Sequence, residues 1–81
     1  TMSDEEKKMY ETWLKQFGKC LSQYRRKHGL TQKEAAKRCS MNERFYTDIE
    51  YGKRPITTRT MFIICSRLFM PTPYEEVIKM L

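Results

Sequence analysis

Residues 31–54 read TQKEAAKRCSMNERFYTDIEYGKR and carry the signals of two short helices joined by a brief polar turn. Thr31 followed by Glu34 forms a capping box that predicts a helix start, and Asn42 is a residue type that caps a second helix. The turn, Ser40 to Asn42, leaves too little chain for a widely separated antiparallel pair. The spacing therefore predicts two helices that cross at a steep angle, as in a helix-turn-helix.

Apolar residues at helical offsets give this stretch one inner face. Ala36 is small enough for a close helix crossing, and the other inward positions are Ala35, Cys39, Met41, Tyr46 and Ile49. The second helix, expected over residues 42–51, is too short to be stable alone and needs tertiary packing. Its outward positions are polar or charged, and the basic pair Lys53 and Arg54 follows it.

Upstream of this stretch, Ser3 and Glu6 form another capping box that opens a first helix. An apolar stripe follows at three- and four-residue steps, formed by Met9, Tyr10, Trp13, Leu14, Phe17, Leu21 and Tyr24. The stripe fits one helix that runs to about Lys27 and equally a helix that bends near Gly18. Gly29 predicts a left-handed cap at the end of this segment.

Downstream, Pro55 stops the chain, and Thr57 or Thr58 can cap a fourth helix. Its inner positions at helical spacing are Met61, Ile64, Cys65 and Leu68. Thr72, Pro73 and Glu75 predict the start of a final helix. Because no segment shows sustained strand alternation or a hairpin turn, the sequence predicts an all-α fold.

Length and charge narrow the class of protein. The 81 residues allow one small domain. The net charge of +6 is concentrated in residues 19–38, which contain seven basic residues and one acidic residue, 7 − 1 = +6. Such a cluster fits a polyanionic partner or a solvated helix face. No apolar run reaches the length of a bilayer span, and the N-terminus is acidic and polar. We therefore expect a soluble, cytoplasmic protein with no membrane partner.

The residue types that carry catalysis or bind metals are scarce. Cys20, Cys39 and Cys65 are odd in number and widely spaced, so we expect reduced thiols that pack as small apolar residues. The single histidine, His28, is expected at the surface or in a helix cap. No nucleophile lies beside a base in a known motif, and there is no glycine-rich phosphate loop. The sequence thus predicts no enzyme, no metal and no cofactor.

Two motifs resemble the Cro and phage-repressor family of helix-turn-helix proteins, also called the xenobiotic-response-element (XRE) family. They are GLTQKEAA at residues 29–36 and IEYGKR at residues 49–54, and the resemblance covers Phe17 to about Lys79. It implies a lambda-repressor-like five-helix DNA-binding domain over residues 17–81. Residues 1–16 are then an N-terminal extension with an extra helix.

The resemblance also implies roles for individual residues. Arg25 and Glu50 correspond to a structural ion pair that does not read DNA. Gln32 is implied to contact the DNA backbone, and Lys53 and Arg54 suit phosphates. The implied base contacts are Asn42, Glu43, Arg44, Thr47 and Asp48. Phe45 either packs inside the protein or touches a thymine methyl group. A carboxylate next to Arg44 can orient it or add selectivity. Ser40 replaces the turn glycine of the family and predicts a strained left-handed backbone.

We therefore expect a sequence-specific transcriptional regulator, a repressor or autoregulator, that binds double-stranded operator DNA as a homodimer through the recognition helix 42–51. Candidate dimer residues, with core packing as the alternative, are Phe62, Phe69, Met70, Tyr74, Val77 and Ile78. A restriction-modification controller is an alternative within the regulator class. A second alternative is an antitoxin-like interaction module, whose protein partner would be encoded by an adjacent gene.

Overall fold

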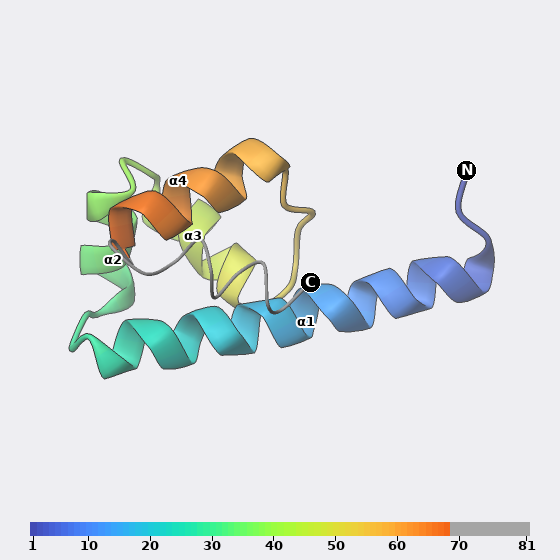
Figure 1. Ribbon diagram of the computed structural model, residues 1–81, viewed down its shortest axis with the longest axis horizontal. Coiled ribbons are helices and arrows are strands. Elements are labelled where there is room, and N and C mark those ends of the chain that lie inside the picture. The colour runs from blue at the N-terminus through green and yellow to red at the C-terminus, as the bar shows by residue number, and fades with distance from the viewer. Residues whose placement is uncertain (69–81) are drawn as a thin grey trace.

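Four helices make up the part of the chain that the computed structural model describes, residues 1–68. They are α1 (Asp4–Lys27), α2 (Gln32–Arg38), α3 (Glu43–Glu50) and α4 (Thr58–Leu68), and no strand occurs in this range (Figure 1). The predicted all-α fold is confirmed. The final helix expected near Thr72, and the dimer candidates Phe69, Met70, Tyr74, Val77 and Ile78, lie outside the described residues.

The first helix is continuous from Asp4 to Lys27. Of the two predicted alternatives, the structure therefore has the single helix and not the one that bends near Gly18. Its start is the predicted capping box: the Glu6 amide donates to Ser3 Oγ (3.2 Å), and the Ser3 amide donates to Glu6 Oε1 (2.9 Å). The expected N-terminal extension is helical, but it is the first part of α1 and projects beyond the other helices (Figure 1). The division at residue 16 is marked by no break in the helix and stays a prediction.

Local capping signals position the other helices as the sequence predicts. Thr31 and Glu34 form the second capping box, with bonds of 2.9 and 3.1 Å, and Thr57 accepts from the Thr60 amide at 3.1 Å ahead of α4. Gly29, after α1, has φ +70°. Ser40 has φ +54°, so the turn before α3 contains the predicted left-handed serine, at a cost of about 1–2 kcal/mol.

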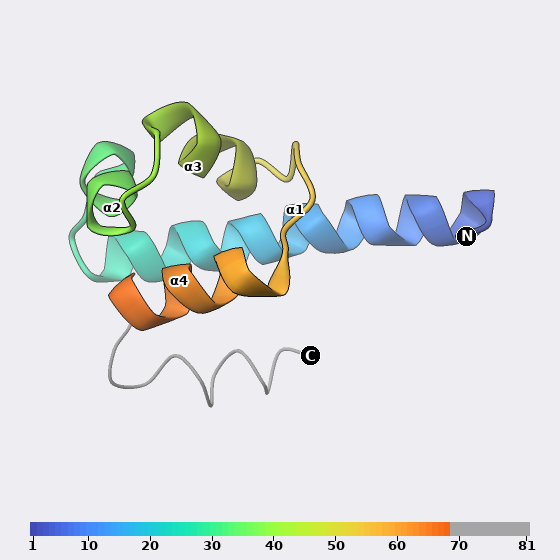
Figure 2. The same ribbon diagram turned by 90° about the horizontal axis from the view of Figure 1, so that it is seen from above.

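The core lies where α1, α2, α3 and α4 meet. Figure 1 shows α2, α3 and α4 on the same side of α1, and Figure 2 shows α4 across from α2 and α3. The buried cluster comprises Phe17, Leu21, Leu30, Ala35, Ala36, Cys39, Tyr46, Ile49, Ile64 and Leu68. Tyr46 is completely buried and belongs to the same cluster as the small residues Ala35 and Cys39.

Gly18 sets how closely α1 approaches the end of α3. A Cβ atom on Gly18 would lie 2.6 Å from the Glu50 carbonyl carbon and 2.8 Å from the Ile49 carbonyl oxygen, so the two helix backbones touch there. Gly52, with φ +69°, makes a similar contact, because a Cβ on it would lie 2.8 Å from the Lys15 Cα atom. Two glycines therefore let α1 and α3 meet without a side chain between them.

Two of the cysteines are part of the core. Cys39 and Cys65 are buried, Cys20 is half-buried, and all three are free thiols. Burial raises the pKa of the Cys39 thiol to about 11, so it is protonated at neutral pH and packs as a small apolar side chain. Within residues 1–68, no helix combines the length and the apolar character needed to cross a bilayer.

Gly18→Ala tests the close contact between α1 and the end of α3, because the contact decides whether the substitution stabilises or destabilises the protein. Alanine in a free helix would stabilise by about 1 kcal/mol relative to glycine. We expect the opposite, a loss of about 2 kcal/mol in the free energy of unfolding, because the methyl group overlaps the α3 backbone. Urea denaturation measures this change in the free energy of unfolding. The exposed neighbour Gln16→Ala should change stability by less than about 0.5 kcal/mol; a stabilising Gly18→Ala would contradict the contact.

Candidate nucleic-acid interface

The two faces of α3 have different environments. Tyr46 and Ile49 point into the core and are fully buried, and α3 packs against both α1 and α2. On the opposite face, Glu43 and Arg44 are exposed and Thr47 is partly exposed. In Figure 2, α3 lies at the opposite side of the view from α4. An eight-residue helix is thereby fixed along one side and presents polar side chains along the other.

Asn42 holds the start of α3. Its Oδ1 atom accepts from the Arg44 amide at 2.8 Å and from the Phe45 amide at 3.3 Å. The capping oxygen is thus occupied, and the side-chain NH₂ group is the part that can donate outward. One turn later, the Thr47 hydroxyl donates to the Arg44 carbonyl at 3.1 Å, which orients the Thr47 side chain along the helix.

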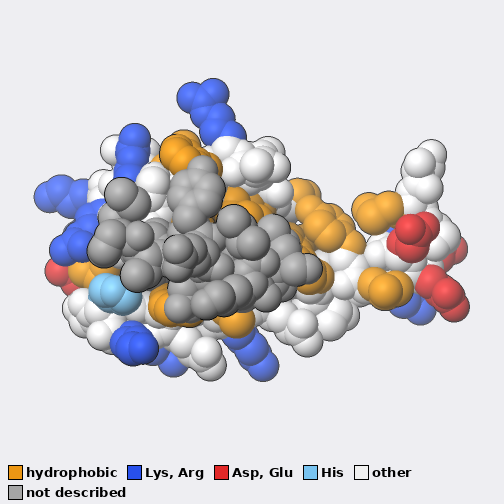
Figure 3. All heavy atoms as spheres, in the orientation of Figure 1, with side chains coloured by type: hydrophobic (Ala, Val, Ile, Leu, Met, Phe, Trp, Pro, Cys, Tyr) orange, Lys and Arg blue, Asp and Glu red, His pale blue; other side chains and the backbone are white. Residues whose placement is uncertain are grey.

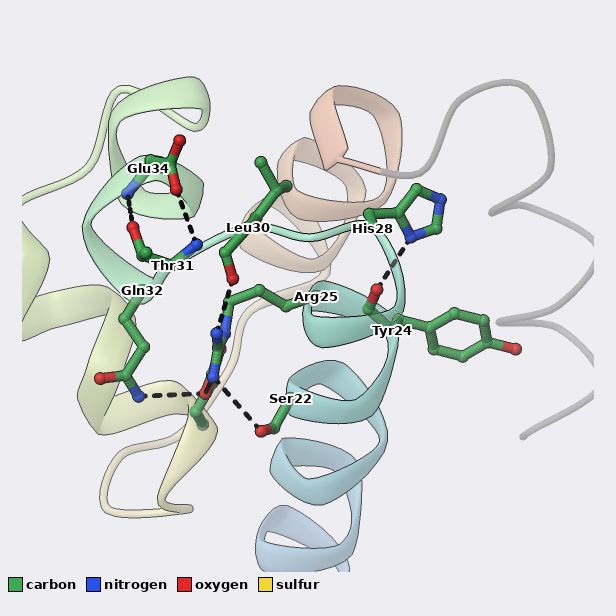
Figure 4. Close-up of polar contacts among 9 residues, drawn as sticks. Ser22, Tyr24, Arg25, His28, Leu30, Thr31, Gln32 and Glu34 are labelled. Atoms are coloured by element: carbon green, nitrogen blue, oxygen red, sulfur yellow. Dashed lines mark hydrogen bonds and ion pairs between the residues drawn. The ribbon is translucent and has the colours of Figure 1, made fainter.

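The end of α3 is fixed by a buried ion pair. Arg25 Nε lies 2.6 Å from Glu50 Oε2, and Arg25 Nη2 donates to Glu50 Oε1 at 3.2 Å. The side chains are 9% and 2% exposed. Arg25 also donates through Nη1 to the Leu30 carbonyl at 2.8 Å, in the loop between α1 and α2 (Figure 4). One guanidinium from α1 therefore holds both the end of α3 and the loop that leads into α2.

Gln32 extends this network to the start of α2. Its Nε2 atom donates to Glu50 Oε1 at 3.1 Å (Figure 4). The buried hydroxyl of Tyr46 lies near the same carboxylate but makes no hydrogen bond of ordinary geometry. Burial acts to raise the pKa of Glu50, but the hydrogen bonds led by Arg25 outweigh it, and the pKa lies below its ordinary value. Glu50 is therefore ionised at neutral pH.

A second polar cluster lies on the outer face of α3. Asp48 Oδ1 is 3.4 Å from Arg44 Nε, and Asp48 Oδ2 is 3.4 Å from Arg54 Nη2. The Arg54 guanidinium carbon is 4.3 Å from the centre of the Phe45 ring, in a cation–π arrangement. Lys53 Nζ lies 5.6 Å from the centre of the Tyr51 ring. The basic residues after α3 thus fold back against the helix.

Comparison with known proteins agrees with this geometry. A family model described as helix-turn-helix, HTH_3, matches residues 21–74, which is most of the chain. The chain belongs to the Cro/C1-type (XRE) helix-turn-helix family. No curated protein and no solved structure matched the sequence. The family is a DNA-binding regulatory domain and not typically enzymatic, and its members bind double-stranded DNA.

This helix-turn-helix regulator has its charges distributed unevenly in space. Figure 3 shows acidic side chains at the N-terminal end of α1, the end that holds Asp4, Glu5 and Glu6. Lys and Arg side chains surround the other end of the molecule, near α2 (Figure 3). Of the seven basic residues in 19–38, only Arg25 is buried; the exposed ones are Lys19, Arg26, Lys27, Lys33, Lys37 and Arg38. The body of the regulator is therefore the cationic end.

The predicted DNA contacts come from α3, from the start of α2 and from the segment after α3. The outward residues of α3 share one face, and Gln32 reaches that helix through Glu50. Phe45 is partly buried and packs against the core, so the first of its two expected roles, packing, is observed. Among the dimer candidates only Phe62 is described; it lies on α4 and is 49% exposed. His28 caps α1 and its ring Nδ1 lies 2.8 Å from the Tyr24 carbonyl oxygen.

Sequence reasoning missed two features of this site. One is the backbone contact at Gly18, for which a glycine inside an otherwise helical apolar stripe was the available signal. The other is the cluster of Phe45, Asp48 and Arg54. Its geometry depends on how the chain folds back after Gly52, and no local pattern specifies that path.

Glu50→Gln tests the buried ion pair. It leaves Arg25 charged and buried, so we expect the free energy of unfolding at pH 7 to fall by about 3 kcal/mol. Because the folded-state pKa of Glu50 lies below its unfolded value, the ion pair stabilises above pH 4.5 and this stabilisation is lost as the pH falls through the folded-state pKa. The variant should therefore lose less stability than the wild type as the pH falls below 4.5, measured by denaturant unfolding at each pH.

Glu34→Gln is the matched control for that experiment. Glu34 is an exposed capping carboxylate, and glutamine can still accept from the Thr31 amide. Its loss at pH 7 should stay below about 1 kcal/mol. Equal stability of Glu50→Gln and the wild type at pH 7 would mean that the ion pair does not hold α3.

Proposed function

We propose that this protein is a transcriptional repressor or autoregulator that binds operator DNA through the outer face of α3. The observation that carries this proposal is the division of α3 into a buried face, fixed at its end by Arg25, and a polar face that is exposed. A helix presented in this way fits the major groove of B-DNA, where base pairs have distinct patterns of donors and acceptors.

The exposed side chains of α3 provide chemistry for base recognition. Arg44, 82% exposed, can donate two hydrogen bonds to guanine O6 and N7, and Glu43 can accept from the cytosine amino group. The NH₂ group of Asn42 and the side chain of Thr47 could add further contacts. Gln32, at the start of α2, and Lys53, just after α3, are suitable for phosphate contacts that fix the register of the protein on DNA.

A homodimer is the second part of the proposal. One recognition helix reads only a few base pairs, and two copies on inverted half-sites about one helical turn apart give the usual specificity. Phe62 and the apolar residues Phe69, Met70, Tyr74, Val77 and Ile78 are the proposed contact surface between copies. A restriction-modification controller would use the same DNA face and differ in the gene it controls.

An interaction module that binds another protein is the second candidate. The observation that favours it is the projecting first part of α1 (Figure 1), where Met9 is 70% exposed, together with Met2 just before the helix, which is 45% exposed. A partner encoded by an adjacent gene could cover these side chains, as in antitoxin-like proteins. Stable co-purification with such a partner, together with equal affinity for all DNA sequences, would favour this function over the regulator.

Titration of labelled DNA tests the regulator directly. We expect a duplex selected by the protein from a random library to bind at least about 10³-fold more tightly than the unselected library, and salt to weaken both. The selected duplexes should contain inverted repeats with centres about ten base pairs apart. Equal affinity for selected and unselected DNA would contradict the proposed function.

Two substitutions separate recognition from positioning. Arg44→Ala should cost about 1–3 kcal/mol on the selected duplex and little on random DNA, because it removes a base contact. Lys53→Ala should weaken binding to both DNAs alike and reduce the slope of log K against log salt by about one. If Arg44→Ala weakened both DNAs equally, Arg44 would be a phosphate contact.

A further inference from the structure

Two arginines share one carboxylate on the outer face of α3, but their environments differ. Asp48 is 16% exposed and lies 3.4 Å from both Arg44 Nε and Arg54 Nη2. Arg44 precedes Asp48 by one helical turn and is 82% exposed, whereas Arg54 comes from the segment after the helix and is 38% exposed. The two ion pairs therefore differ in how readily water or DNA can replace them.

Arg54 is held from two directions. Its guanidinium lies over the Phe45 ring at 4.3 Å, and its Nη2 atom faces Asp48. Its Nε atom is buried and has no hydrogen-bond acceptor. This donor has no access to solvent and cannot reach a phosphate, so DNA could meet only the Nη groups of the guanidinium, one of which already faces Asp48. Arg54 is thus a poor candidate for a DNA contact and a good one for a structural clamp.

Arg44 is held far more weakly. An exposed ion pair between residues four apart on a helix contributes little, because water screens it and the side chain loses entropy in forming it. Asp48 orients Arg44 along the helix but releases it at small cost when a stronger partner, such as a guanine edge, becomes available. In contrast, Arg54 stays with Asp48, because stacking on Phe45 adds to the ion pair.

We propose that Asp48 and Arg54 are positioning residues: Arg54 neutralises Asp48, so that Arg44 is oriented by this carboxylate yet free to leave it for DNA. This inference rests on the proposed function, and it assigns to Asp48 and Arg54 a role other than the direct DNA contacts that the family resemblance implies. Without Arg54, the Asp48 carboxylate would repel nearby phosphates and hold Arg44 more strongly. Removing the carboxylate as well should relieve both effects.

The test is rescue of Arg54→Ala by Asp48→Asn. Binding to the selected duplex and to random DNA is measured at four salt concentrations for the wild type, both single variants and the double variant. We expect Arg54→Ala to weaken binding to the selected duplex about tenfold without changing the salt slope, and the double variant to recover most of that loss. A salt slope lower by about one, with no recovery in the double variant, would show that Arg54 contacts phosphate and would overturn the inference.

A measurement without DNA separates this inference from the proposed function. In urea unfolding, Arg54→Ala should lower the midpoint less in the Asp48→Asn background than in the wild type, because only the stacking on Phe45 is then left to lose. In NMR spectra the Phe45 ring current should shift the side-chain protons of Arg54, and Arg54→Lys, which keeps the charge but not the planar guanidinium, should lack this shift. If the midpoint shifts of the two single variants add up fully in the double variant while DNA binding is intact, this inference alone is overturned. If the wild type shows no specific DNA binding, the proposed function is overturned and this role with it.

Discussion

The buried ion pair between Arg25 and Glu50 is the interaction on which the rest of the structure depends. It joins the middle of the sequence to the first helix, and the same guanidinium holds the Leu30 carbonyl in the loop that leads to α2. Two buried charges cost desolvation energy, which is recovered only when the geometry is good and the remaining donors and acceptors are satisfied. Here three donors, two from Arg25 and one from Gln32 at the start of α2, bond to the Glu50 carboxylate.

This network solves a problem that arises from the shortness of α3. A helix of eight residues has little intrinsic stability, and its position must come from its neighbours. Asn42 caps its start, Tyr46 and Ile49 bury one face, and Glu50 anchors its end. Neither the buried face nor the ion pair involves Glu43 or Arg44, so these two exposed side chains are not needed to hold the helix in place.

Local signals in the sequence predict much of this fold, because capping is a local interaction. The boxes Ser3–Glu6 and Thr31–Glu34 and the cap at Asn42 all occur where the residue types predict them, whereas the left-handed Ser40 was predicted through the family resemblance. The pairing of Arg25 with Glu50 spans 25 residues, and the sequence suggested it only through a family resemblance.

Contacts that depend on the tertiary path were not predictable in this way. The stripe in residues 9–24 did not decide between a continuous and a bent first helix, and the overlap at Gly18 requires knowing where α3 ends. Arg54 follows a basic pattern typical of phosphate contacts, but its stacking on Phe45 results from the turn at Gly52. Charge type is therefore a weaker guide to function here than the environment of each charge.

Mapping of backbone amide shifts by NMR during titration with the selected duplex tests the central claim most directly: the outer face of α3 binds DNA while the buried network stays intact. The account predicts large changes at Gln32, Asn42 to Thr47 and Lys53, with the side-chain signals of Arg25 unchanged. Changes concentrated in α4 or in the projecting part of α1, with α3 unaffected, would contradict it.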